Sequence, residues 1–322
     1  MFPVIDVSNW ERLSMEQMGT KPKFWCQSED GGEYLFKESR SHAGEHWSEK
    51  IAAEIAQWIG LSHASIELAV CNDKKGTISK NFLPLDKSCS LVHGNELLSK
   101  IDESYPKEAP NFSVVQHTLP RIIEALDEHH AQPPMTAIIP EGVTTGSDYF
   151  LGYLMLDALI TNTDRHHQNW GITISSSETV GHDTEIAPTF DHASSLGREL
   201  TDRRRDDKYQ AELRRNETVS PSRRDQTIVG YLESRKGRSR IYEAEAEANP
   251  LHPIDVFRIA FARYNTPSDA WINRLQSLDY SQVRQIVQKI PNNIMSEPAR
   301  SFCLKLIELN YHAIISRGFQ YE

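Results

Sequence analysis

The stretch LITNTDRHHQNWGI, residues 159–172, places a run of polar residues between two segments of regular structure. An apolar helix-forming segment, 147–160, precedes the run, and a short strand-forming segment, 171–175, follows it. Asp164, two histidines and Asn169 lie in the bend itself. Loops that a rigid scaffold holds in place often carry binding and catalytic residues. The bend is therefore the first candidate for a functional site.

A second aspartate lies beyond the bend, in APTFDHASSLG. A predicted hairpin, 171–175 and 185–190 with the polar loop SSSETVGHDT, separates Asp191 from the bend. In phosphoryl transfer one aspartate orients the acceptor hydroxyl and takes its proton, while an asparagine and another aspartate hold magnesium through hard oxygen ligands. We therefore predict Asp164 as the catalytic base and Asn169 and Asp191 as catalytic metal ligands.

Phosphoryl transfer also needs a cation for the nucleotide phosphates. Lys37 ends the strand-forming stretch EYLFK and is the candidate. Glu49, on the following helix-forming segment, 44–60, is the candidate partner that positions this lysine, because such a pair joins strand to helix in protein kinases. Glu45 and Glu54 are rival carboxylates on the same segment.

The pattern of the whole chain divides it into two parts. Up to about residue 92, strand patterns at 23–26, 33–37, 66–71 and 77–82 surround the helix of 44–60. Beyond it, helix patterns dominate, at 112–129, 147–160 (with Ser147 or Asp148 as N-cap), 253–263, 268–276, 280–289 and 296–315. We predict an α+β protein with a β-rich N-terminal lobe, 1–92, that binds nucleotide phosphates. A larger helical lobe, 93–322, carries the catalytic and metal-binding loops, and the ligand cleft lies between the two lobes.

At these motifs the chain resembles the HipA-like kinases. Their catalytic loop has the motif N-x-D-x-H-x-x-N, which Asn162, Asp164, His166 and Asn169 match. The stretch FDHASSLG resembles the family's magnesium-binding segment and places Asp191 as the metal ligand. The resemblance implies a two-lobed protein-kinase-like fold, ATP and Mg²⁺ as cofactors, and phosphorylation of protein serine or threonine.

Weaker resemblances extend the match to about residues 19–197. LFK with Lys37, and EKIAAEIAQWIGL with Glu49 and Gly60, are similar to the family's nucleotide-binding lysine and the helix behind it. On this resemblance we expect a chain similar to the shorter HipA-like kinases, without the extra N-terminal subdomain of the full-length toxins. Characterised members include toxins of toxin–antitoxin pairs that attack the translation machinery. A translation-related enzyme as substrate and an antitoxin as partner are the hypotheses that this resemblance raises.

The resemblance also assigns residues to the nucleotide. Gly19, Thr20 and Lys23 stand where the family has its phosphate loop, although this loop has one glycine and a proline that removes a backbone donor. Ser14 is the nearest serine to that loop and the candidate for autophosphorylation. By analogy, Asn81, Phe82 and Leu83 form the link between the lobes and meet the adenine through backbone groups.

Composition limits the other classes of function. The 322 residues are 39% apolar and 25% charged, which is typical of a globular protein. No apolar run approaches a membrane span, no secretion signal begins the chain, and the four cysteines form no CxxC pair. These features predict a cytoplasmic protein without membrane contact. The net charge of −10 argues against direct sequence-specific binding of nucleic acid.

The segment 198–240 departs from the acidic average, with 13 Lys and Arg against 8 Asp and Glu. It follows the predicted metal-binding segment, where kinases shape the acceptor site. One interpretation is a surface that recruits an acidic protein or a target bound to nucleic acid. The other is a solvated helix with i,i+4 ion pairs.

Four alternatives stay open at this point. The histidines and aspartates of the bend, with His182-Asp183 and His192, also suit a metal-dependent phosphohydrolase. The same fold hosts kinases of lipids or small molecules. A non-catalytic pseudokinase or binding module is the third alternative, and the fourth is that the bend is only a polar turn. We predict that His166 braces the loop, that His167 is exposed, and that Asp157 bonds within the loop.

Overall fold

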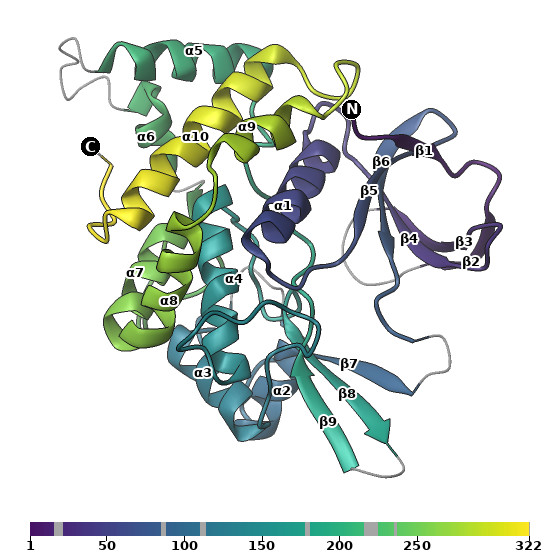
Figure 1. The fold of residues 1–322 in the computed structure, drawn as a ribbon, viewed down its shortest axis with the longest axis vertical. Helices are drawn as coiled ribbons and strands as arrows, with labels where there is room; N and C mark the ends of the chain where they lie inside the picture. Colours follow the sequence, from purple (N-terminus) through teal and green to yellow (C-terminus); the bar gives the residue numbers. More distant parts are fainter. Residues whose placement is uncertain are drawn as a thin grey trace.

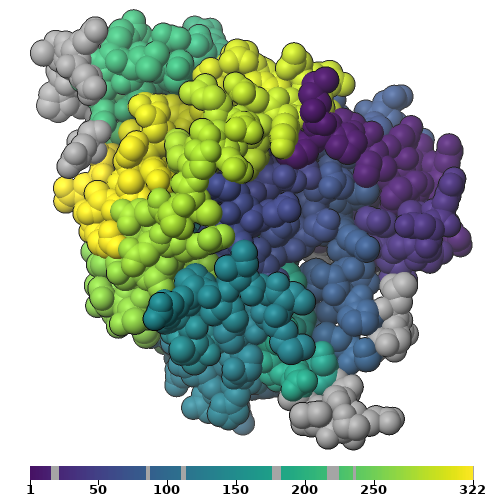
Figure 2. Space-filling model, in the orientation of Figure 1, coloured from purple at the N-terminus to yellow at the C-terminus, as the bar shows by residue number. Residues whose placement is uncertain are grey.

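The computed structural model describes residues 1–15, 22–84, 88–109, 114–177, 181–215, 225–234 and 237–321. It is an α+β protein in which a mainly β N-terminal part stands beside a mainly helical C-terminal part (Figure 1). Figure 2 shows the purple N-terminal residues on the right of the view, where the first of them adjoin the yellow-green C-terminal residues at the top.

The N-terminal part is built on a six-stranded sheet of order β1-β5-β6-β4-β3-β2. Its strands are β1 (Val4–Asp6), β2 (Glu11–Met15), β3 (Lys23–Gln27), β4 (Glu33–Glu38), β5 (Ile66–Cys71) and β6 (Lys74–Lys80). All neighbours are antiparallel except β1 and β5. Asn72 and Asp73 turn β5 into β6 with positive φ angles, the conformation that a two-residue hairpin needs.

Helix α1 (Glu45–Ile59) lies between this sheet and the C-terminal helices (Figure 1). Gly60 ends it in the left-handed conformation, with φ 91°. The six residues 45–50 are all buried, although four of them are charged or can carry charge. Their side chains bond in several directions. Ser48 bonds to Ser195, and Lys50 bonds to the carbonyl of Ile66 at 2.8 Å.

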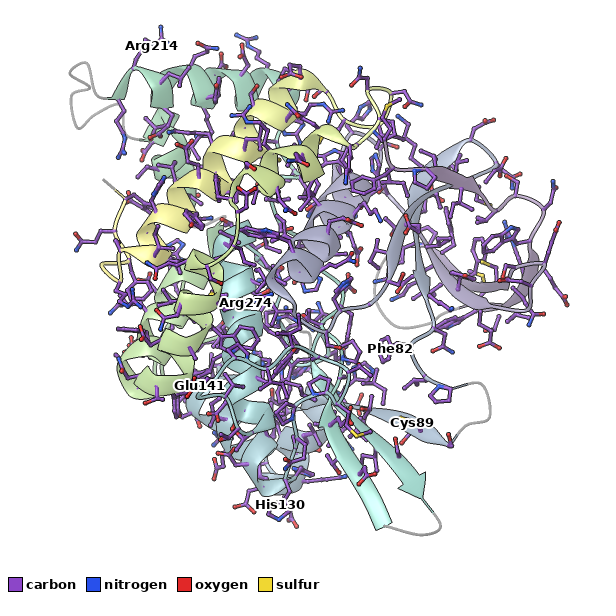
Figure 3. All side chains as sticks on the ribbon, viewed as in Figure 1. Phe82, Cys89, His130, Glu141, Arg214 and Arg274 are labelled. Carbon is purple, nitrogen blue, oxygen red and sulfur yellow. The ribbon has the colours of Figure 1, made fainter. Side chains whose placement is uncertain are left out.

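A second sheet, β7-β8-β9, lies beside the C-terminal helices (Figure 1). Its strands are β7 (Cys89–His93), β8 (Gly171–Ser177) and β9 (Gly181–Ile186), all antiparallel. Phe82 lies where the chain leaves the first sheet on its way to β7 (Figure 3). Because β7 pairs with β8, the link between the two parts leads to the strand that follows the polar bend, residues 161–170.

The helical part is arranged around α4 (Gly146–Ile160), whose residues are all buried except Asp148. An apolar helix of this kind requires neighbours on every side. The other helices are α2 (Gly94–Ile101), α3 (Leu119–Glu128), α5 (Asp202–Leu213), α6 (Ile228–Leu232), α7 (Pro253–Arg263), α8 (Asn265–Gln276), α9 (Ser281–Gln288) and α10 (Glu297–Ile315). The polar bend follows the C-terminal end of α4, so the packing of this helix fixes where the bend begins.

The predicted fold class is confirmed, and several predicted boundaries are wrong. The helix predicted from residue 112 begins at Leu119, where Thr118 is the N-cap and Pro120 favours the first turn. The N-cap of α4 is Thr145, and Asp148 is the third helical residue of its capping box. The strand predicted at 185–190 is β9, which ends at Ile186, before Pro188. His182 and Asp183 lie in this strand and not in a loop tip.

The sequence analysis did not predict β1, β2, β7, α2 or α6. These are short elements of three to eight residues, whose apolar patterns are too brief to stand out. The basic segment contains α5, a largely exposed helix in which only Arg205 and Glu212 are buried. The proposed lobe boundary at residue 92 stays a prediction. In the described part of the chain no helix has the length and apolar character that crossing a bilayer requires.

Gly152 tests the packing of α4, because a Cβ there would lie 2.6 Å from the buried Trp271 ring. In an open helix, glycine to alanine stabilises by about 1 kcal/mol. Here we expect Gly152→Ala to destabilise by about 1–3 kcal/mol through overpacking, as measured by urea unfolding. In a Trp271→Phe background the penalty should shrink. A stabilising Gly152→Ala would contradict this packing.

Candidate active site

The polar bend begins where α4 ends, at Thr161. Thr161 adopts a left-handed conformation, with φ 54°, which turns the chain sharply out of the helix. Asn310 of α10, fully buried, donates to the carbonyl of Leu159 and to Oγ1 of Thr161, both at 2.9 Å. The start of the bend is therefore fixed by the longest helix of the C-terminal part.

Arg165 is the internal support of the bend. Its side chain is fully buried and forms a two-pronged ion pair with Asp157 of α4, at 2.7 and 2.8 Å. Its Nη1 donates to the carbonyl of Asn169 at 2.6 Å, and its Nη2 donates to Oγ1 of Thr189 at 3.0 Å. One guanidinium thus connects the helix before the bend, the far end of the bend and the segment that leads to Asp191. The predicted role of Asp157 within the loop is confirmed.

Asp164 and Asn169 are brought together by the backbone. The amide Nδ2 of Asn169 donates to the carbonyl of Asp164 at 2.8 Å, and the Asn169 N–H donates to the carbonyl of His166. This leaves the amide oxygen of Asn169 without a hydrogen-bond donor among the described residues. An oxygen of that kind suits a hard cation such as Mg²⁺.

The Asp164 carboxylate is half-buried and faces two side chains. Arg240 places Nε 3.3 Å from Oδ1, and Ser194 directs its hydroxyl toward Oδ2 at 3.4 Å. Burial raises the pKa of Asp164 above its usual 3.8, the Arg240 charge opposes that rise, and the Asp191 carboxylate adds to it. A carboxylate held in this way is a stronger proton acceptor than one in water.

Asp191 meets Lys37 at the end of β4. The Lys37 ammonium lies 3.3 Å from Oδ2 of Asp191 and 3.8 Å from Oε1 of the buried Glu49. Burial lowers the pKa of Lys37, but the charges of Asp191 and Glu49 outweigh burial and raise it overall, so the lysine stays protonated. Asp191 has φ 58°, a left-handed conformation that is uncommon outside glycine and typical of functional sites.

The three glutamates of α1 have different ion-pair partners. Glu49 pairs with Lys37, Glu45 pairs with Arg40 and Arg198, and Glu54 pairs with Lys50. The structure therefore brings Glu49, and neither rival, to the predicted nucleotide lysine.

A cleft of about 280 Å³ runs from these charges toward the link between the two parts. Lys37, Asn169 and Asp191 line one end, and the predicted Asn81, Phe82 and Leu83 line the other. Trp25, Leu35, Leu91 and Phe190 give it apolar walls, and the rings of Phe82 and Phe190 stack with centroids 6.2 Å apart. A cleft with one apolar end and one charged end suits a nucleotide, with its flat base and its phosphates.

The other predicted residues fall in several places. Lys23 of β3 lines the cleft, while Gly19 and Thr20 lie outside the described residues. Ser14 lies in β2, every residue of which is exposed. At the link, the N–H of Leu83 donates to Oδ1 of Asn81 at 3.0 Å, so the Asn81 side chain engages that backbone donor. Asp164 does not line the cleft but lies beyond its charged end.

The prediction that His167 is exposed is wrong. His167 is buried, accepts or donates a hydrogen bond at 2.9 Å with the hydroxyl of Tyr105, and packs edge-on against the His117 ring. It is this histidine that joins the bend to the surrounding core. His166 lines the cleft and accepts a hydrogen bond from the Gln168 N–H. The bend leaves strand geometry, so adjacent side chains point in directions that an alternating pattern cannot give.

The sequence analysis missed the apolar walls of the cleft, and also Arg165 and Arg240. The wall residues lie on three strands and one loop that are far apart in the sequence, so no local motif reveals them. The sequence held one signal for Arg165, which is its place in a motif directly after a buried helix. An arginine that is buried at such a place requires a charged partner. Nothing in the sequence near Arg240 links it to Asp164, 76 residues away.

The donor set fits a divalent ion held between protein and phosphate. Mg²⁺ binds one or two protein oxygens together with substrate phosphates and waters, and the Asn169 amide and the Asp191 carboxylate lie at the same end of the cleft. In the parts of the chain that the structure describes, no three His, Cys, Asp or Glu side chains gather as a metal cluster. The ligands that the phosphohydrolase alternative needs are therefore not assembled there.

Comparison with known proteins bears on the fold. The chain matches no protein-family model and no curated protein. Among solved structures it is similar to the Helicobacter pylori proinflammatory kinase CtkA, with a TM-score of 0.69 and 19% identity over 99% of this chain and 100% of that one. The chain has a protein-kinase-like fold. At this identity the similarity establishes the fold, and the activity has to be argued from the site.

Two further kinases match less well. HipA of a Shewanella oneidensis toxin–antitoxin complex gives a TM-score of 0.47 at 13% identity, over 97% of this chain and 65% of that one. A Golgi casein kinase gives 0.42 at 13% identity, over 98% and 74%. Both scores lie below 0.5 and carry no argument about this chain.

Replacing Arg165 with methionine would leave Asp157 buried without its ionic partner. We expect Arg165→Met to destabilise the protein by about 3–5 kcal/mol in urea unfolding. The double variant Arg165→Met, Asp157→Leu should recover part of that loss, because it removes the unpaired charge. Arg203→Met, at a 92% exposed position on α5, serves as the control and should change stability little. Equal effects of the two arginine variants would contradict the support role.

His117 gives the fold a defined sensitivity to acid. It accepts a hydrogen bond from Nε1 of Trp170 at 3.0 Å and donates Nδ1–H to the carbonyl of Arg240 at 2.9 Å, so it is neutral in the fold. Burial lowers its pKa from 6.5 to about 3. Below pH 6.5 the unfolded chain takes up a proton that the folded chain refuses, so stability falls as the pH falls.

At pH 5 this single group should cost about 2 kcal/mol relative to pH 7.5. His117→Gln lacks the titrating ring, so urea unfolding at the two pH values should show a pH dependence smaller by about that amount. The variant is expected to be less stable at both values. A pH dependence identical to that of the wild type would contradict the buried neutral histidine.

Proposed function

We propose that this protein is an ATP- and Mg²⁺-dependent kinase that phosphorylates serine or threonine in proteins. The observation that carries the proposal is the assembly of Lys37, Glu49, Asn169 and Asp191 at one end of a nucleotide-sized cleft, with Asp164 immediately beyond it. These residues come from a strand, a helix and two loops, and each has the chemistry that phosphoryl transfer requires.

The proposed roles follow from the position of each side chain. The base would lie against the apolar end near Phe82 and Phe190, and the phosphates against Lys37. Asn169 and Asp191 would hold Mg²⁺, which would neutralise charge on the phosphates when bound. Glu49 keeps the lysine in place, and its burial makes that position rigid.

Transfer would take place at Asp164. The acceptor hydroxyl would donate a hydrogen bond to the carboxylate, which orients it toward the terminal phosphorus. The bond between hydroxyl oxygen and phosphorus forms as the bond to the departing ADP oxygen breaks, and the hydroxyl proton passes to Asp164. The Arg165 network holds the bend during this step, so most of the rate gain comes from positioning and charge.

The motif N-x-D-x-H-x-x-N supports a finer proposal, that the kinase is of the HipA-like type. In that case autophosphorylation, an antitoxin partner and a translation-related substrate are proposals that follow from the type. Kinase activity itself does not depend on them. The predicted cytoplasmic location belongs with the same proposals.

The test is the intact mass of the purified chain after incubation with Mg-ATP. Wild type should gain units of phosphate, or transfer phosphate to a mixture of serine and threonine peptides. Asp164→Asn should lower the rate by about 10²–10⁴-fold while still binding nucleotide, because it removes the proton acceptor and little else. Lys37→Met should weaken nucleotide binding as well.

Asp183→Asn on β9 is the matched control, since it makes the same substitution at an exposed residue far from the cleft charges. It should retain the wild-type rate. Wild type that binds no nucleotide would end the kinase proposal. Transfer to a lipid or small alcohol, and to no protein, would replace it with the other acceptor class.

A further inference from the structure

Arg240 reaches the catalytic carboxylate from a rigid backbone. Its carbonyl accepts the hydrogen bond from the buried His117, and its neighbour Ser239 donates its N–H to the carbonyl of Leu251 at 2.8 Å. The next residue, Ile241, is 1% exposed. The position of the Arg240 backbone is therefore set by the core, and the side chain extends from it to Asp164.

The guanidinium of Arg240 is only partly used. Its Nε lies 3.3 Å from Oδ1 of Asp164, and its Nη1 and Nη2 make no hydrogen bond with any described residue. The side chain is 36% exposed, so its outer edge faces solvent. Arginine binds carboxylates and phosphates best through this planar fork, with two parallel hydrogen bonds.

Asp164 and Arg240 both lie outside the cleft that would hold the nucleotide. Lys37, Asn169 and Asp191 line the cleft, whereas neither Asp164 nor Arg240 is among the described residues that do so. An acceptor hydroxyl bound to Asp164 would therefore lie within reach of the Arg240 side chain, which contacts the same carboxylate.

The charges around Asp164 make a cation at this place consequential. The Asp164, Asp191 and Glu49 carboxylates together would repel an acidic acceptor, and Lys37 is already paired with two of them. Arg198 is the other cation that acts on Asp164, and its two terminal nitrogens bond to Glu45 and Ser194. Both terminal nitrogens of Arg198 are thus already engaged, whereas those of Arg240 make no hydrogen bond with a described residue.

We propose that Arg240 binds a carboxylate next to the acceptor hydroxyl, so that the enzyme selects serine or threonine flanked by an acidic residue. This inference rests on the proposed kinase function and names its substrate class. The acidic side chain would occupy the fork while the hydroxyl lies against Asp164. A neutral peptide would meet the same base without that second attachment.

The test compares synthetic serine peptides that carry one glutamate within two positions of the serine with the same peptides carrying glutamine. For the best placed glutamate, wild type should show about a tenfold higher kcat/KM, the scale of one charge-assisted pair. Arg240→Ala should reduce the ratio to about one, and the ratio is the readout because the variant also removes the ion-pair partner of Asp164. With a third set of peptides that carry lysine at the same position, Arg240→Glu should favour lysine over glutamate.

Arg203→Ala is the matched control, because it removes one positive charge from α5 at an exposed position whose ion pair, within the described residues, is with Asp207. It should keep the wild-type ratio, and thermal unfolding should show both alanine variants folded. If Arg240→Ala lowers transfer to both peptides equally, the arginine serves Asp164 or the transferred phosphoryl group, and the inference is overturned.

A ratio that Arg240→Ala leaves unchanged would also overturn it, as would wild type that modifies itself but prefers no glutamate peptide. In each of these cases the kinase proposal stands. Wild type that binds Mg-ATP but transfers phosphate to no acceptor at all would remove the proposed function and this inference together.

Discussion

The ion pair between Arg165 and Asp157 is the interaction on which the site depends. Two charges without access to water are stable only when their hydrogen bonds are complete, and here the guanidinium reaches the helix, the bend and the segment before Asp191. Because a single side chain makes these bonds, the proposed base and the proposed metal ligands are held in one frame. Arg165, Asp157 and Thr189 are all buried, whereas other residues of the bend line the cleft.

Above this frame the site concentrates negative charge. Two carboxylates, Asp191 and Glu49, pair with one lysine, and burial together with the nearby Asp191 charge raises the pKa of Asp164. A cation or a phosphate-bound metal is the natural complement on the cleft side, and Arg240 supplies the complement on the other. Positive groups on both faces thus balance the negative charge of the site. A cation or metal does so on the cleft face, and Arg240 does so on the other.

The sequence was sufficient where a motif is local and the chemistry is specific. Asp164, Asn169 and Asp191 are close in sequence or separated by one hairpin, and Lys37 and Glu49 lie on consecutive elements, so their types and order could be interpreted directly. The walls of the cleft and Arg240 could not be predicted, since they depend on packing between distant segments. The error on His167 has a related cause, because the orientation of adjacent side chains in an irregular bend depends on backbone angles that no periodic pattern encodes.

Helix α1 has a consequence for how small molecules can act on this protein. Its residues 45–50 are attached to Arg198, Ser195, Lys37 and Ile66, which lie on three different segments. Any ligand that needs a displaced helix must supply enough binding energy to break several of these buried attachments at once, since it can shift the equilibrium only by its preference for that state. Inhibitors are therefore better sought in the aromatic end of the cleft, where Trp25, Phe82 and Phe190 offer ring surfaces to a ligand.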